Sequence, residues 1–303
     1  MKNIRFIQFP HPGGEHRPGP DGSGKAWNRI TLPDGSNISH ARTFFQVNGT
    51  RLTGEGMVTG PLWAWGEWEA EANVLRAWEG ADGGPTTLFE PFWVRKNGFE
   101  NLHNTDPFVF GGFFYTDCKQ GTSPSSQGML ELDVGSVIIF GSVSRGRWVL
   151  DTVFVVRDYI DHNSANYQER LHNRVPAGYD QLVLGPTYGP HSDRRHLPRR
   201  LYIGATFSEP LDGMFSFFPC SAPGDTQGFA RPEIKLSTVL TNEYFNPNLA
   251  QGMKGQSKSA AALPLARVKA LWDEVRGQVR ASGCELGVCA DMPQQQGMRA
   301  TSQ

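Results

Sequence analysis

The 303-residue chain has no long hydrophobic runs and no excess of either charge. No apolar run approaches the ~18 residues that a membrane span needs. The opening Met1–Phe6 segment lacks the apolar stretch of a signal peptide. Lys and Arg number 29 against 30 Asp and Glu, which excludes a uniformly basic coat for nucleic acid but leaves room for a local patch. We therefore expect a cytoplasmic protein with no membrane partner.

Cysteine is scarce, and several well-known motifs are absent. The four cysteines are too few for a disulfide framework in a chain of this length, and no C-x-x-C occurs. We expect four reduced thiols, three of them buried by packing. The chain has no P-loop, no G-x-S-x-G, no H-E-x-x-H and no dinucleotide fingerprint after a strand. These absences argue against a nucleotide cofactor and against a serine hydrolase.

Short β-type runs separated by Gly and Pro dominate the first half of the chain. Such spacing is typical of a closed or strongly bent antiparallel sheet. We expect a small β-barrel core over residues 1–160, in which a Ser-Arg-Gly turn joins the last two strands into a hairpin. The expected strands are Ile4–Phe9, Thr43–Val47, Trp63–Glu69, Thr87–Val94, Phe110–Thr116, Ser136–Gly141 and Trp148–Val156.

The second half is more mixed, so the predicted fold class is α+β and β-rich. Residues 161–291 are expected to form a mixed extension on the core, and residues 292–303 a mobile tail. The clearest helix is Leu265–Ser282, because its apolar residues recur at a spacing of three and four and Gly283 ends it. The other expected elements are a helix over Ser164–Asn173, capped by Ser164, and strands over Leu201–Phe207 and Gly213–Phe218.

Two histidines and a carboxylate are concentrated in one glycine-containing loop. His11, Glu15 and His16 lie within six residues, and His40 is within plausible reach. Zinc accepts histidine nitrogen and cysteine sulfur, so His11, His16, His40 and Cys118 are candidate metal ligands. The spacing matches no common zinc signature, and exposed histidines hydrogen-bonded to backbone remain an equal alternative.

The segment Trp63–Glu69 is rich in tryptophan and glutamate. Strand alternation places Trp65 and Glu67 on one face and Trp68 on the other. A ring beside a carboxylate suits a flat heterocycle with an N–H edge, so Trp65 and Trp68 are candidate substrate-binding residues and Glu67 a candidate acid/base. Aromatic packing in the core is the alternative, although it would bury Glu67 at a cost.

A polar turn and a cysteine flank the next predicted strand. Asn104 and Asp106 belong to a turn-forming Asn-Thr-Asp-Pro sequence, and we take Asn104 as substrate-binding and Asp106 as catalytic. Cys118 follows Asp117 and precedes Lys119. An ammonium favours a thiolate and a carboxylate opposes it, so Cys118 is a candidate nucleophile or zinc ligand. A half-buried cysteine at a strand end is the alternative.

Positive charge is concentrated only in the segment that holds Arg194, Arg195, His196, Arg199 and Arg200. A guanidinium group can donate two hydrogen bonds to the oxygens of a phosphate. Arg195 is therefore our candidate for contact with a substrate strand. A solvated loop is the alternative.

Four segments resemble those of a group of bacterial proteins without an assigned activity: Gly14–His16, Trp65–Glu69, Asn104–Gly111 and Asp151–Val156. This resemblance spans most of residues 1 to 220. The strand order resembles the PUA-like barrels (EVE, ASCH and YTH modules), which commonly hold nucleic acid or a modified base. The chain also resembles DpdC, a protein of 7-deazaguanine DNA modification that converts a nitrile to an amide. No DpdC site positions are carried over, because the residues do not match one by one.

These observations lead to one main hypothesis and two alternatives. The main one is an enzyme that hydrates or hydrolyses a modified nucleobase, of 7-deazaguanine type, in DNA, with Cys118 as nucleophile or with zinc activating water. The first alternative is a non-catalytic reader of modified bases, and the second a small-molecule hydrolase. The sequence does not indicate an oligomeric state.

Overall fold

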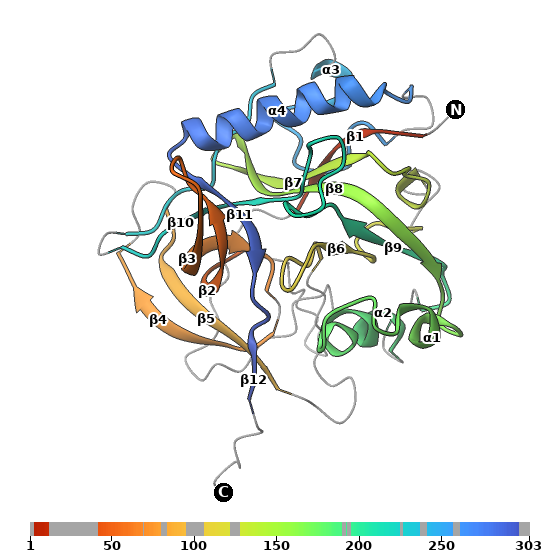
Figure 1. Cartoon of the computed structure of the whole chain (residues 1–303), viewed down its shortest axis with the longest axis horizontal. Coiled ribbons are helices and arrows are strands. Elements are labelled where there is room, and N and C mark those ends of the chain that lie inside the picture. The colour runs from red at the N-terminus through yellow and green to blue at the C-terminus, as the bar shows by residue number, and fades with distance from the viewer. Residues whose placement is uncertain are drawn as a thin grey trace, which may run out of the picture.

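The computed structural model describes residues 3–11, 42–68, 70–79, 84–94, 106–121, 128–189, 192, 195–224, 227–236, 241–256 and 261–296. Within these ranges twelve strands form two mixed sheets with few helices (Figure 1). The coarse prediction of a β-rich fold is therefore confirmed.

The first sheet has the strand order β1-β7-β8-β9-β6. The predicted hairpin at Ser-Arg-Gly is confirmed as β7–β8, and β8 extends well beyond its predicted end. The pairing of β1 with β7 is parallel and the others are antiparallel. The bounds are β1 Phe6–Pro10, β6 Phe114–Tyr115, β7 Val137–Ser144, β8 Arg147–His162 and β9 Arg199–Gly204.

The second sheet has the order β11-β10-β3-β2-β5-β12, and β4 pairs with β5. One edge of β2 is shared, since its first half meets β5 and its second half meets β11. The pairings β2–β3–β10–β11–β2 thus return to their start, while the sheet continues outward through β5. The bounds are β2 Thr43–Leu52, β3 Met57–Gly66, β4 Ala72–Ala77, β5 Thr87–Val94, β10 Phe218–Ser221, β11 Glu285–Ala290 and β12 Gln294–Gln296.

The prediction of a wholly antiparallel sheet is wrong. Three pairings are parallel, namely β1–β7, β2–β5 and β5–β12. Both sheets also draw strands from each side of residue 160, and β8 crosses that position. The sequence indicated which segments are extended, but long connections between parallel partners leave no local signal that identifies the partner.

Besides a 3₁₀ turn over residues 128–130, the described residues form four α-helices and one π-helical turn. They are α1 Tyr167–Leu171, a π-helical turn η2 Asp180–Leu184, α2 Gly185–Tyr188, α3 Thr241–Tyr244 and α4 Leu265–Ala281. The prediction of α4 is confirmed: Val268, Trp272, Val275 and Val279 are buried, and Gly283 adopts φ +86° after the helix. None of the described helices has the length and apolarity required to span a bilayer.

Several predicted boundaries are wrong at the level of single elements. The strand expected at Trp63–Glu69 is β3, which begins at Met57 and ends at Gly66. The expected helix cap at Ser164 is absent, because α1 begins at Tyr167 after Asn166. The strand expected over Gly213–Phe218 forms only from Phe218 onward as β10. In the expected mobile tail, β12 pairs with β5.

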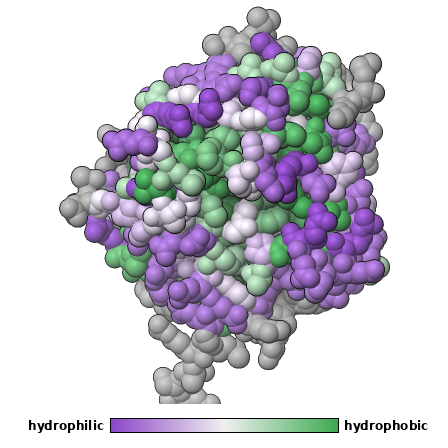
Figure 2. All heavy atoms as spheres, viewed as in Figure 1, coloured by the Kyte–Doolittle hydropathy of each residue, from purple (hydrophilic) through white to green (hydrophobic). Residues whose placement is uncertain are grey.

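Two large apolar clusters hold these layers together. The apolar face of α4 packs with β1, β7 and β8 around Val137, Val153 and Trp272. A second cluster around Phe45, Phe110, Tyr115 and Phe140 joins residues of both sheets. Figure 2 shows that hydrophobic residues also gather in the middle of the viewed face, with hydrophilic residues around them. His11, described next, packs against the rings of Phe9 and Phe140 in the second cluster.

Candidate functional site

A buried network of charged side chains connects the two sheets. His11 follows β1, Arg42 precedes β2, Glu67 follows β3, and Asp151 lies in β8. Arg42 donates from Nη1 to Glu67 Oε2 at 2.8 Å and from Nε to Asp151 Oδ2 at 3.0 Å. The side chains of Arg42 and Glu67 are each 1% exposed. Segments far apart in the sequence therefore place two carboxylates on one enclosed guanidinium.

The network continues at both ends. His11 Nδ1 lies 3.4 Å from Glu67 Oε2, and the backbone N–H of His11 donates to Gly141 O, which extends the β1–β7 ladder. At the other end, Arg231 Nη1 lies 3.2 Å from Asp151 Oδ1 and donates to Ser142 Oγ at 2.6 Å. The result is a continuous series of ionisable groups from His11 to Arg231.

The charges of the network offset one another. Burial lowers the pKa of Arg42, but the carboxylates of Glu67 and Asp151 outweigh this effect, so the pKa is raised. Cys118 adds a smaller contribution in the same direction. The ring of Phe9 lies 4.8 Å from that of His11 and 5.9 Å from that of Tyr115, whose hydroxyl bonds Cys118 O. The structure thus brings Glu67 and His11 together, and aromatic rings connect the turn of Cys118 to His11.

Asp106 organises the turn that carries Cys118. Its carboxylate accepts the backbone N–H groups of Thr116, Asp117 and Cys118 at 3.0, 2.8 and 2.8 Å. Burial raises the pKa of Asp106 well above its usual value, and these three donors oppose that rise. Because Asp106 is fully buried and accepts these three backbone donors, it fixes the conformation of the turn that carries Cys118. Its catalytic role stays a prediction.

Two further side chains surround this turn. Tyr115 donates its hydroxyl to Cys118 O at 2.6 Å, and burial raises its pKa well above 10, so the phenol stays protonated. Lys119 adopts φ +58° and holds its Nζ 5.8 Å from the centre of the Phe9 ring. Burial lowers the pKa of Lys119 and the charge of Cys118 opposes this. Cys118 itself is half-buried.

The tryptophans occupy opposite faces of β3 and its extension. Trp65 packs with Phe44, donates its indole N–H to Phe229 O at 2.7 Å and lies 5.2 Å beneath the guanidinium of Arg231. Trp68 lies in the other core, against Phe110. Both indoles are at most 5% exposed, so a base would reach the Trp65 ring only after Arg231 moves.

The zinc hypothesis concerns four ligands, of which the structure describes His11 and Cys118. His11 Nδ1 faces Glu67, and the Arg42 guanidinium occupies the same carboxylate oxygen. The guanidinium of Arg42 already neutralises the Glu67 carboxylate. A zinc ion bound beside it would be repelled by the positive charge of Arg42. In the described ranges no three His, Cys, Asp or Glu side chains lie close enough to hold a metal. His11 and Cys118 alone do not form a zinc site.

Three predicted site residues, His16, His40 and Asn104, lie outside the described residues. Arg195 is exposed in a turn, and its contact with a nucleic acid stays a prediction. Its neighbours are not one solvated patch, because Arg199 is buried on Asp117 and Arg200 pairs with Asp161 at 2.6 Å.

A second buried network, missed by the sequence reasoning, adjoins the Cys118 turn. His162 is hydrogen-bonded through Nε2 to Thr116 Oγ1 at 2.9 Å and through Nδ1 to the hydroxyl of Tyr188 at 2.8 Å. Burial, with a contribution from Arg199, lowers the pKa of His162 to about 4, so the imidazole is neutral at pH 7. The Asp161-His162-Asn163 sequence gave only a turn signal.

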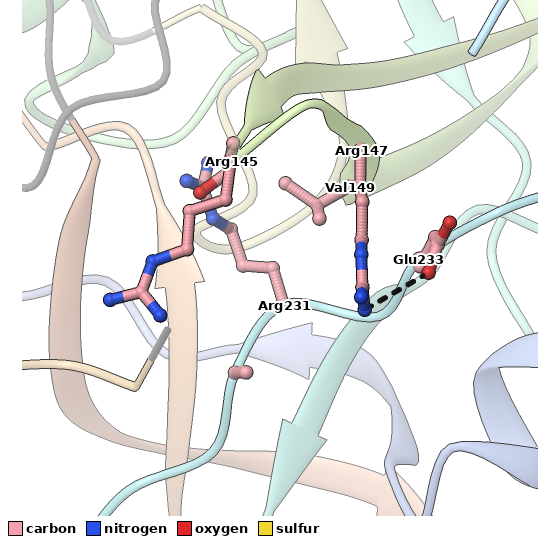
Figure 3. Close-up of a pocket in the computed structure, with 7 residues that line it drawn as sticks. Arg145, Arg147, Val149, Arg231 and Glu233 are labelled. Atoms are coloured by element: carbon pink, nitrogen blue, oxygen red, sulfur yellow. Dashed lines mark ion pairs between the residues drawn. The ribbon is translucent and has the colours of Figure 1, made fainter. Parts of the chain in front are cut away.

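A basic recess was also missed. Its volume is about 370 Å³, and it lies between the β7–β8 turn and the coil after β10 (Figure 3). Its charged lining residues are Arg145, Arg147, Arg231 and Glu233. The two arginines of the Ser-Arg-Gly-Arg sequence could have indicated a basic site, but the sequence predicted only a hairpin turn there. Arg231 belongs to both this recess and the buried network.

Comparisons of the chain with protein-family models, with curated proteins and with solved structures found no match.

Proposed function

We propose that the protein is an enzyme that hydrates or hydrolyses a modified nucleobase of 7-deazaguanine type in DNA, with Cys118 as its nucleophile. The observation that supports this proposal is the buried His11–Glu67–Arg42 network, to which the rings of Phe9 and Tyr115 join the turn of Cys118. Ionisable groups gathered in an enclosed space from distant segments are typical of catalytic sites. The finer fold assignment, a PUA-like barrel around β2, β3, β10 and β11, belongs to the same proposal.

The proposed roles follow the logic of an activated nucleophile. His11 takes the thiol proton of Cys118 through Nε2, because its Nδ1 faces Glu67. Glu67, held by Arg42, orients the imidazole and stabilises its protonated form. Asp106 and Tyr115 hold the backbone N–H and carbonyl of Cys118 in place through hydrogen bonds.

For a nitrile substrate the chemistry balances without a cofactor. The sulfur of Cys118 bonds to the nitrile carbon while the nitrogen accepts the proton from His11, which gives a thioimidate. Water adds to that carbon, the carbon–sulfur bond breaks, and the thiol regains a proton. The product is an amide, and the net reaction consumes one water. A target base within a duplex must first be turned out of the helix.

The test uses duplex DNA that contains 7-cyano-7-deazaguanine, with the nucleosides analysed by mass spectrometry. Wild-type protein should add one water to the base. Cys118→Ala should abolish turnover, and Cys289→Ala, the same change at another half-buried cysteine, should leave it intact. Full turnover by Cys118→Ala would refute the role of Cys118 as the nucleophile.

The same assay separates the alternatives that the sequence leaves open. A reader would bind the modified DNA without turnover, and Cys118→Ala would bind equally well. A small-molecule hydrolase would act on the free base and ignore the DNA at low salt. Stoichiometric zinc in the purified, active protein would replace the thiol mechanism by metal-activated water.

A further inference from the structure

The recess beneath the β7–β8 turn gathers positive charge from two segments. In Figure 3, Arg145 and Arg147 extend from the hairpin toward the coil, and Arg231 extends from the coil toward the hairpin. Glu233 is the acidic member of the lining. It lies 3.6 Å from Arg147 and 2.9 Å from Lys235, so its charge is offset within its own surroundings. The recess keeps a net positive charge.

Arg231 is fixed in place before any ligand arrives. Asp151 and Ser142 hold its Nη1, and the ring of Trp65 lies 5.2 Å from its guanidinium carbon. Its side chain is only 7% exposed. A guanidinium that is already ordered loses little conformational freedom on binding, which favours affinity.

Arg145 occupies a backbone position that arginine does not favour. Arg145 and Gly146 have φ values of +51° and +75°, and they form the two-residue loop between the paired residues Ser144 and Arg147. Positive φ at both positions is the feature of a type I′ turn, in which Asn or Gly is preferred first. A side chain that is unfavourable for the turn, and that lines a recess, points to a role in binding.

From these observations we infer that the recess binds a phosphate group. Planar arginine forks donate paired hydrogen bonds to phosphate oxygens, and a volume of about 370 Å³ admits a nucleotide rather than a bare ion. Both a free nucleotide and one nucleotide of a DNA strand carry this group. The inference goes beyond the proposed function, because it does not depend on the chemistry of Cys118.

The decisive variant is Arg145→Asn, since asparagine suits the turn and removes the charge. It should melt at or above the wild-type temperature and bind phosphate roughly tenfold or more weakly, the effect of losing one charge-assisted hydrogen bond. Glu233→Gln should bind severalfold more tightly. Arg174→Gln is the charge-matched control, because Arg174 pairs with Asp158 on the surface.

Calorimetric titration should use inorganic phosphate, a deoxynucleoside 5′-monophosphate and a single-stranded ten-nucleotide DNA, each at low salt. Tighter binding of the monophosphate than of the DNA identifies a free nucleotide as ligand, and the reverse order identifies a strand. With the DNA, Arg145→Asn should also reduce the salt-dependence slope by about one. Cys118→Ala should bind like wild type whether or not the proposed enzyme activity is found.

Two results would overturn the inference. One is wild-type protein that binds none of the three probes at low salt. The other is a folded Arg145→Asn whose affinity equals that of wild type and of Arg174→Gln.

Discussion

Arg42 and Glu67 form a buried ion pair at the open end of the β2–β3 hairpin, with Nη1 and Oε2 2.8 Å apart. Thr43 pairs with Gly66 in the ladder, so these residues are the next pair beyond it. The hairpin register therefore determines where the guanidinium meets the carboxylate. It also presents Arg42 to Asp151 of the other sheet, and the pair thereby links the two sheets.

We expect Arg42→Met to destabilise the protein strongly. The change leaves Glu67 and Asp151 buried without their shared cation, and breaking a buried ion pair from one side costs about 3–5 kcal/mol. Urea unfolding measures the loss. Arg174→Met, at a solvent-exposed pair with Asp158, should change the free energy of unfolding by less than about 1 kcal/mol. Equal effects at both positions would contradict the assigned role of Arg42.

The stability of the fold should decrease on mild acidification because of His162. Its pKa is lowered from 6.5 to about 4 by burial and by Arg199. The unfolded chain therefore binds a proton at higher pH than the folded protein does. Stability from this group is complete above about pH 6.5 and is lost as the pH falls toward 4, by about 3 kcal/mol in total.

Chemical unfolding measured at several pH values tests this expectation, with His162→Gln as the comparison. The variant should be less stable at pH 7, because glutamine does not reproduce both hydrogen bonds to Thr116 and Tyr188. It should also show a flatter profile between pH 4 and 6.5. An unchanged slope would mean that other groups control the acid sensitivity.

Asp106→Ala should loosen the turn that carries Cys118. Three backbone N–H groups lose their acceptor, and each buried unsatisfied group costs about 1–3 kcal/mol. Alkylation of Cys118 should become faster as the turn opens, which mass spectrometry of the peptide detects. Asp106→Asn keeps one acceptor oxygen and should have a smaller effect. Wild-type stability in Asp106→Ala would refute this account.

The four thiols should react in a defined order with iodoacetamide in the native protein. Cys118 should react first, since it is half-buried and lies near the positive charge of Arg42. Cys220 and Cys284 should react last, because they are buried and burial raises the pKa of each. Peptide mapping after short exposures gives the order, and early labelling of Cys220 would contradict it.

Local patterns in the sequence predicted local structure well. The three-and-four spacing from Leu265 located α4, and strand alternation separated Trp65 from Trp68. The alternation also placed Glu67 on an aromatic face, where a buried carboxylate is stable only if it has a partner. It could not name Arg42, because that partner depends on the register of a hairpin whose first strand extends past its predicted end.

The remaining parts of the site depend on pairings between distant segments. Nothing near Asp106 indicates that its carboxylate accepts the N–H groups of residues 116–118, and the turn signal alone led to a catalytic interpretation. Arg231 stood alone in the sequence, with no arginine beside it to mark a basic patch. Its significance arises only where the coil after β10 meets β7 and β8.

The shared edge of β2 also has a consequence for synthesis on the ribosome. Its second half pairs with β11, whose residues are more than 200 positions later in the chain. That half stays an open strand edge until nearly the whole polypeptide has emerged, and such edges promote association between nascent chains. A truncated product that ends before Glu285 should therefore need chaperones to remain in solution, and slow elongation of the full chain should lengthen the time for which the edge is exposed.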